Sequence, residues 1–81
     1  MTDAELNERI DAIQRDADRL SAEARNVLHA CRPGHPLGRG HDKADLFRNA
    51  AFVLSGRSCV STRHVDWLNR MANVFADERA A

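Results

Sequence analysis

The stretch TDAELNERIDAIQRDADRLSAEARNVLHAC, residues 2–31, decides the expected fold. Its apolar residues recur at alternating steps of four and three, which is the a/d pattern of an amphipathic helix. Thr2 and Glu5 have the spacing of a capping box, and no glycine or proline interrupts the run. We therefore expect one long helix over about residues 3–31. Its apolar seam consists of Leu6, Ile10, Ile13, Ala17, Leu20, Ala24 and Val27.

The length of this expected helix predicts self-association. At about 1.5 Å per residue the helix would be roughly 43 Å long. The rest of the chain has room for only two shorter helices, which leave part of such a seam uncovered. The sequence therefore predicts a homodimer in which a second copy covers the seam.

The remaining residues predict a loop followed by two shorter helices. The segment RPGHPLGRGH, residues 32–41, holds both prolines and three of the four glycines, which favour turns over helix. Asp42 is a suitable N-cap for a helix over about residues 43–55, and a last helix follows over about 62–78. The expected fold is all-α, with a single domain over 1–81 arranged as a three-helix bundle or a helical hairpin.

Residues 50–66, AAFVLSGRSCVSTRHVD, resemble a joint between two helices in the lid subdomains of AAA+ ATPases and in histone folds. The residues that carry the resemblance are Gly56, Arg57, Val60, Ser61 and Val65. It describes a joint and implies no activity. The aromatic residues near this joint are expected in the core; they are Phe47, Phe52, Trp67 and Phe75.

The composition argues against several classes of protein. Twelve basic and twelve acidic residues give a formal charge of zero, with an acidic excess in residues 1–31 and a basic excess in residues 32–81. This split can steer a charged partner, but it is too weak to indicate nucleic acid. Two cysteines are too few for a disulfide scaffold, and no apolar run approaches the roughly 18 residues of a membrane span. We expect a cytoplasmic protein that does not contact a membrane.

Residues 29–41, HACRPGHPLGRGH, gather four residues of the types that bind zinc. Their spacing fits no standard zinc site, and His29 and Cys31 would point to different sides of a helix. We therefore expect no metal. The candidate ligands are His29, Cys31, His35 and His41.

Catalytic and nucleotide-binding motifs are also missing. The glycines of the loop and Lys43 do not have the spacing of a phosphate-binding loop. Cys59 or Ser58 could pair with His64, but no third group can be assigned to orient the histidine. We therefore expect a protein without a cofactor that is not an enzyme.

The surplus of apolar surface favours a small helical protein–protein interaction module. Such a module would act as a regulator, as an inhibitor (for example a phage anti-CRISPR or host-takeover type protein) or as an accessory subunit of a larger complex. This expectation reflects what small stand-alone helical proteins of bacteria and phages often do, and no motif supports it. The residues expected to face the partner are Arg32, His35, Arg39, His41, Arg63 and Arg70.

The alternative is a DNA-binding transcriptional regulator in which the two shorter helices form a helix-turn-helix. The segment STRHVDWLNR, residues 61–70, would be the recognition helix. Trp67 argues against this, because it stands mid-helix where a polar residue facing the groove is wanted. The DNA contacts would be Thr62, Arg63, Asn69 and Arg70.

Overall fold

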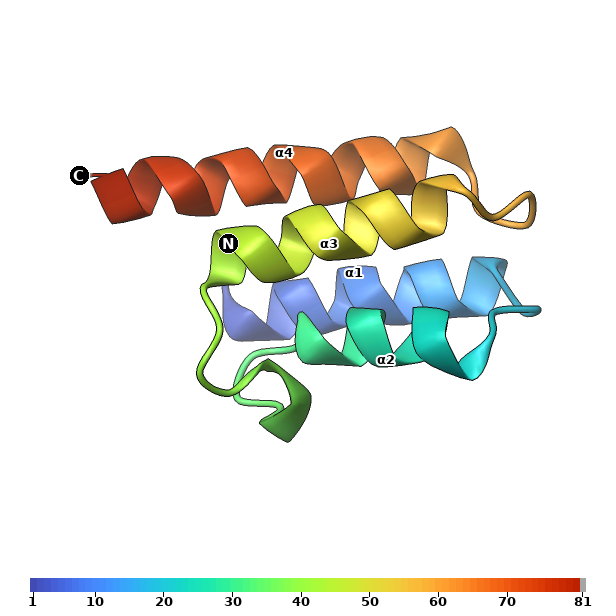
Figure 1. The fold of residues 1–81 in the computed structure, drawn as a ribbon, viewed down its shortest axis with the longest axis horizontal. Helices are drawn as coiled ribbons and strands as arrows, with labels where there is room; N and C mark the ends of the chain where they lie inside the picture. Colours follow the sequence, from blue (N-terminus) through green and yellow to red (C-terminus); the bar gives the residue numbers. More distant parts are fainter. Residues whose placement is uncertain (81) are drawn as a thin grey trace.

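The computed structural model describes residues 1–80, and within them the fold is entirely helical, which confirms the all-α prediction. Successive α-helices run in opposite directions along the long axis, so the first two form one hairpin and the last two form a second (Figure 1). The elements are α1 (Asp3–Asp16), α2 (Ala22–Ala30), the short 3-10 helix η1 (Pro36–Gly38), α3 (Lys43–Ser55) and α4 (Thr62–Ala80).

The prediction of one helix over residues 3–31 is wrong, because the chain turns back after Asp16. Ala17 has φ −109° and ψ 72°, outside the helical region. Ser21 is the N-cap of α2, and its hydroxyl accepts a hydrogen bond from the Ala24 N–H at 3.2 Å. The Ser21 hydroxyl therefore satisfies a backbone N–H at the start of α2, and the Asp16 carboxylate at the end of α1 bonds His64 of α4. The chain turns between them without glycine or proline.

The predicted dimer seam is buried inside its own chain. Six of its seven residues are at most 8% exposed: Leu6, Ile10, Ile13, Ala17, Leu20 and Ala24. Val27 is only half-buried, because the fully buried Leu28 takes the inward position on α2. A homodimer through this seam is therefore no longer expected, since its side chains already pack in the core of one chain.

The other helix ends lie at or near the residues where the sequence predicts them. Thr2 and Glu5 form the reciprocal capping box. Asp42 caps α3 by accepting hydrogen bonds from two backbone N–H groups, and Gly56 follows its last residue. The last helix ends at Ala80, two residues beyond the expected end.

The core lies between the two hairpins and takes side chains from all four α-helices. The Phe47 ring packs against Trp67 and Phe75 of α4 at centroid distances of 5.9 and 5.2 Å. Phe52 was expected in this core, but it is 80% exposed. It follows the buried Ala51, and one residue is a rotation of roughly 100° around a helix. Phe52 therefore lies on the outer face of α3.

No helix among residues 1–80 combines the length and the apolar character needed to cross a bilayer.

Candidate functional site

The loop between α2 and α3 is packed tightly against both helices. A Cβ atom on Gly38 would lie 2.3 Å from the Ala30 carbonyl oxygen and 3.2 Å from Leu46 Cδ1, so only glycine fits there. Gly34 and Gly40 have φ of +73° and +83°, a left-handed conformation that glycine adopts without strain. The glycines that predict a loop therefore also give it a specific shape.

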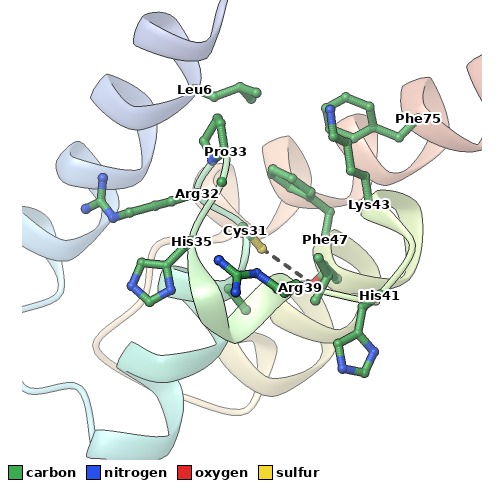
Figure 2. Close-up of a pocket in the computed structure, with 14 residues that line it drawn as sticks. Leu6, Cys31, Arg32, Pro33, His35, Arg39, His41, Lys43, Phe47 and Phe75 are labelled. Carbon is green, nitrogen blue, oxygen red and sulfur yellow. Dashed lines mark hydrogen bonds between the residues drawn. The ribbon is translucent and has the colours of Figure 1, made fainter.

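This loop closes over a pocket of about 240 Å³ (Figure 2). The pocket lies where the loop meets the first halves of α1 and α3 and the second half of α4. We call it the loop pocket. It brings together four residues that the sequence predicted to face a partner, and it adds Lys43, which the prediction missed. These five basic residues are Arg32, His35, Arg39, His41 and Lys43.

Arg32 has a structural role that the sequence did not indicate. Its guanidinium group donates hydrogen bonds to Asn7 Oδ1 at 3.1 Å and Gln14 Oε1 at 3.2 Å, and it forms an ion pair with Asp11. In Figure 2 its side chain points away from the other lining side chains. Arg32 therefore ties the start of the loop to α1.

The histidines near the loop do not form a metal site with Cys31. His29 and His35 stack with ring centroids 5.5 Å apart, and burial is the main cause that lowers the pKa of His29. Within residues 1–80 no group of three or more His, Cys, Asp or Glu side chains is placed to hold a metal ion. The fold thus brings His29 and His35 together but does not add a third ligand to them among the described residues.

Cys31 forms an apolar wall of the loop pocket. Its Sγ lies 3.5 Å from the Leu46 carbonyl oxygen, and burial raises the pKa of the thiol to about 12. The thiol therefore stays protonated at neutral pH and is a poor nucleophile.

A second concave surface lies between α2 and α3 and has a volume of about 670 Å³. We call it the α2/α3 groove. Its apolar lining comes from Val27, Ala30, Leu37 and Leu46, and its polar lining includes Glu23, Asn26, Asp45 and Asn49. The groove and the loop pocket share Ala30, His41 and Leu46, so they lie on two sides of the same loop.

The remaining predicted partner residues, Arg63 and Arg70, lie elsewhere, in a shallow arginine groove between α1 and α4. Arg9, Arg15, Asp16 and His64 also line this groove. Arg9 extends over the Trp67 ring at 5.0 Å. The groove joins residues from two helices that are distant in sequence, and no sequence pattern places Arg9 and Arg15 there.

Asp16 anchors the arginine groove. Its Oδ2 accepts a hydrogen bond from His64 Nε2 at 2.8 Å and contacts Arg63 Nη2 at 3.3 Å. The bond from His64 is the largest cause that lowers the pKa of Asp16, and the charges of His64 and Arg63 add to it. These contacts link the end of α1 to the start of α4.

The two last helices do not form the geometry expected for a helix-turn-helix. Figure 1 shows α3 and α4 side by side and antiparallel, whereas helix-turn-helix motifs cross at about 90–120°. Trp67, within the proposed recognition helix, is 4% exposed and belongs to the core. Arg63 and Arg70 remain exposed on α4.

A comparison with models of protein families, with curated proteins and with solved structures finds no match to this chain.

Proposed function

We propose that the chain is a protein-binding module whose α2/α3 groove receives an amphipathic helix of a partner protein. Phe52, 80% exposed on the outer face of α3, is the observation that carries this proposal. Large aromatic side chains are common anchors of protein interfaces. A phenylalanine left in water beside an apolar groove therefore supports binding by contact.

Phe52 lies beyond the lining of the groove, in a neighbouring hollow that shares Glu23 with it and also contains Arg57. Asp45, Asn49 and Phe52 follow the spacing i, i+4, i+7, so they lie on one stripe of the helix. Leu37 of η1, which is 50% exposed, also lines the groove. The groove and this neighbouring hollow together thus present two exposed apolar side chains as anchors.

The charges along the groove indicate the chemistry of the partner helix. Glu23 on the α2 side pairs with Arg57 at 3.9 Å, so Asp45 on α3 is the acidic lining residue without an ion pair among the described residues. The 13-residue α3 is roughly 20 Å long at about 1.5 Å per residue. A helix of about four turns, with an apolar stripe and basic residues beside it, fits these features.

A module of this kind works by occupying a surface of a larger complex. The chain would therefore act as a regulator, an inhibitor or an accessory subunit, without catalysis of its own. The partner is defined by its chemistry, an apolar helix with basic flanks.

A photo-reactive phenylalanine analogue at position 52 tests the proposal in lysate of the native host. The control carries the same analogue at Val74, which is 44% exposed on α4. We expect cross-links from position 52 to one segment of another protein, with the apolar and basic pattern of the predicted helix. Equal cross-linking at both positions, no cross-link, or a cross-link to a second copy of this chain would each overturn the proposal.

A synthetic peptide of the cross-linked segment then measures the contribution of Phe52. Phe52→Ala should weaken binding by at least about 2 kcal/mol if the ring is an anchor. Val74→Ala, the matched control on α4, should leave the affinity unchanged.

A second candidate function, DNA binding, is favoured by the arginine groove. Arg9, Arg15, Arg63 and Arg70 face one hollow that contains Asp16 as its single acidic residue among those described. Guanidinium groups bind phosphates well. Salt-dependent binding to duplex DNA that weakens in an Arg15→Gln/Arg70→Gln variant would support this function, and its absence at low salt would reject it.

A further inference from the structure

Two histidines meet where α2 ends and the loop begins. His29, in the last turn of α2, stacks on His35 of the loop with ring centroids 5.5 Å apart. Both residues are half-buried. Among the described residues neither has an aspartate or glutamate partner, whereas His64 bonds Asp16. No neighbouring carboxylate therefore stabilises the protonated form of either ring of the pair.

The hydrogen bonds of His29 require a neutral ring. Arg32 Nε donates to His29 Nδ1 at 3.4 Å, and Gln14 Nε2 lies 3.4 Å from His29 Nε2. The Gln14 amide oxygen accepts a hydrogen bond from Arg32 Nη2 at 3.2 Å, which turns the amide nitrogen toward the ring. Both ring nitrogens therefore face N–H donors. A neutral imidazole can accept from one of them, whereas an imidazolium carries a hydrogen on each nitrogen and accepts from neither.

His35 also shapes the loop through an unprotonated nitrogen. It is the N-cap of η1, and its Nδ1 accepts a hydrogen bond from the Leu37 N–H at 3.2 Å. Protonation of Nδ1 removes this acceptor. If both rings were protonated, two positive charges would also lie next to each other in the stacked pair. Each protonation step therefore costs a contact that holds the loop.

The charges nearest His29 also disfavour its protonation. Arg25 lies one turn before it on α2, Arg32 and His35 belong to the loop, and Asp11 of α1 is paired with Arg32. Burial is the largest cause that lowers the pKa of His29 from its ordinary value of 6.5, and the charges of the two arginines and of His35 add to it. The stability linked to His29 is therefore complete above pH 6.5, and it is lost as the pH falls from there toward the lower, folded-state pKa.

Arg32 connects the histidine pair to the position of the loop. Its guanidinium group also bonds Asn7 and Gln14 and pairs with Asp11, all on α1. These contacts and the bond to His29 hold one guanidinium group between α1 and α2. A protonated His29 would present an N–H and a positive charge to this group, which would move away and release the start of the loop.

We propose that the stacked pair of His29 and His35 is a pH switch that holds the loop over residues 32–41 at neutral pH and releases it on acidification. Protonation separates Arg32 from His29 and opens the N-cap of η1. The loop carries Leu37, which lines the α2/α3 groove, so its release changes one wall of that groove. The switch belongs to the free chain and does not depend on the function proposed for the groove.

NMR spectra of the intact chain over a series of pH values test the switch directly. The probes are the imidazole signals of His29, the Arg32 Nε–H signal and the Leu37 backbone N–H signal. We expect His29 to titrate below pH 6.5, and we expect the Arg32 and Leu37 signals to shift with it toward the positions of solvent-exposed groups. Arg32 and Leu37 signals that stay unchanged while His29 titrates, or a His29 that titrates at or above pH 6.5, would overturn the proposal.

Asparagine at both positions tests the switch by removing it. The asparagine oxygen can accept a hydrogen bond in place of Nδ1 but does not titrate, and asparagine is a favourable N-cap. Between about pH 7.5 and 5.5 the unfolding equilibrium constant of the wild type should rise roughly tenfold, the effect of one charge-assisted hydrogen bond. The variant His29→Asn/His35→Asn should change less than about twofold over the same range. Urea denaturation at each pH measures both.

His41→Asn is the matched control. His41 is exposed in the same loop and extends from a different side of it than His35 (Figure 2). This variant should respond to acid as the wild type does, and His64 stays in every protein, so its contribution is common to all. A double variant as acid-sensitive as the wild type, or an equal loss of sensitivity in His41→Asn, would contradict the assignment. If the double variant does not fold, His35→Asn alone decides by NMR, because its Leu37 signal should move less with pH than that of the wild type.

Discussion

The two helical hairpins differ in how their turns are encoded. The connection between α3 and α4 is marked by Gly56 and by Ser61, which accepts a hydrogen bond from the Arg63 N–H at 3.3 Å. The connection between α1 and α2 contains no glycine or proline. Its only turn-favouring residues are Asp16, Asp18 and Ser21. The a/d pattern continues through that turn, so periodicity alone predicts one rod.

This difference shows what hydrophobic periodicity measures. The seam residues are correctly identified as buried, because nearly all of them pack in the core. Their spacing does not reveal whether they meet a second chain or the other half of their own helix. A turn of a few residues can preserve the pattern and reverse the chain direction.

Replacing Leu28 with alanine tests the inward face of α2 and has the largest expected effect. Leu28 is fully buried, so Leu28→Ala should lower the free energy of unfolding by about 2–5 kcal/mol. Val27→Ala should cost about 1 kcal/mol, because Val27 is half-buried beside the groove. Urea denaturation of both variants measures the difference.

The informative quantity is the difference between the two variants in the loss of unfolding free energy. Leucine has one methylene more than valine, which accounts for about 0.8 kcal/mol. A gap larger than that supports the two-helix hairpin. A larger loss for Val27→Ala than for Leu28→Ala would show that Val27 is the inward residue, as expected for one uninterrupted helix. That result would contradict the fold.

Gly38→Ala tests how tightly the loop between the two hairpins packs against α2 and α3. The new Cβ would overlap the Ala30 carbonyl oxygen, so we expect a loss of about 1–3 kcal/mol. Gly56→Ala is the control in the other connection. Its φ is −84° and the nearest atom to a Cβ is 3.9 Å away, so stability should change by less than about 1 kcal/mol. Similar losses in both variants, measured by thermal denaturation, would show that the loop is not packed this tightly.

Asp16→Asn tests the link between the first hairpin and α4, and it has the smallest expected effect. The folded state lowers the pKa of Asp16 from its ordinary value of 3.8. Because its pKa is lower in the folded state, ionised Asp16 stabilises the fold at pH values above 3.8. This stabilisation is lost as the pH falls through the lower, folded-state pKa. The variant should be less stable than the wild type at neutral pH, and the two should converge in acid.

Denaturation of both proteins over a series of pH values measures this convergence. Asp18→Asn is the control, because Asp18 is exposed and forms no ion pair among the described residues. A difference between the wild type and Asp16→Asn that persists unchanged in acid would contradict the proposed link.

The candidate sites were predictable only in part. His35, Arg39 and His41, which the sequence predicted to face a partner, line one pocket together with Lys43. Arg32 was assigned to a partner, but its bonds to α1 could not be foreseen because Asn7 and Gln14 lie far from it in sequence. Phe52 was assigned to the core, although its neighbours already supply a complete inward stripe.

The sequence by itself determined the helical class, the capped helix ends, the glycine-rich loop and most of the buried residues. These features depend on interactions within a few residues of each other, which composition and spacing record directly. Only the tertiary structure decided that the first helix is two, that the seam is covered by its own chain, and that distant cations share a pocket and a groove. Those outcomes depend on contacts between residues far apart in sequence, and a local pattern is compatible with more than one set of such contacts.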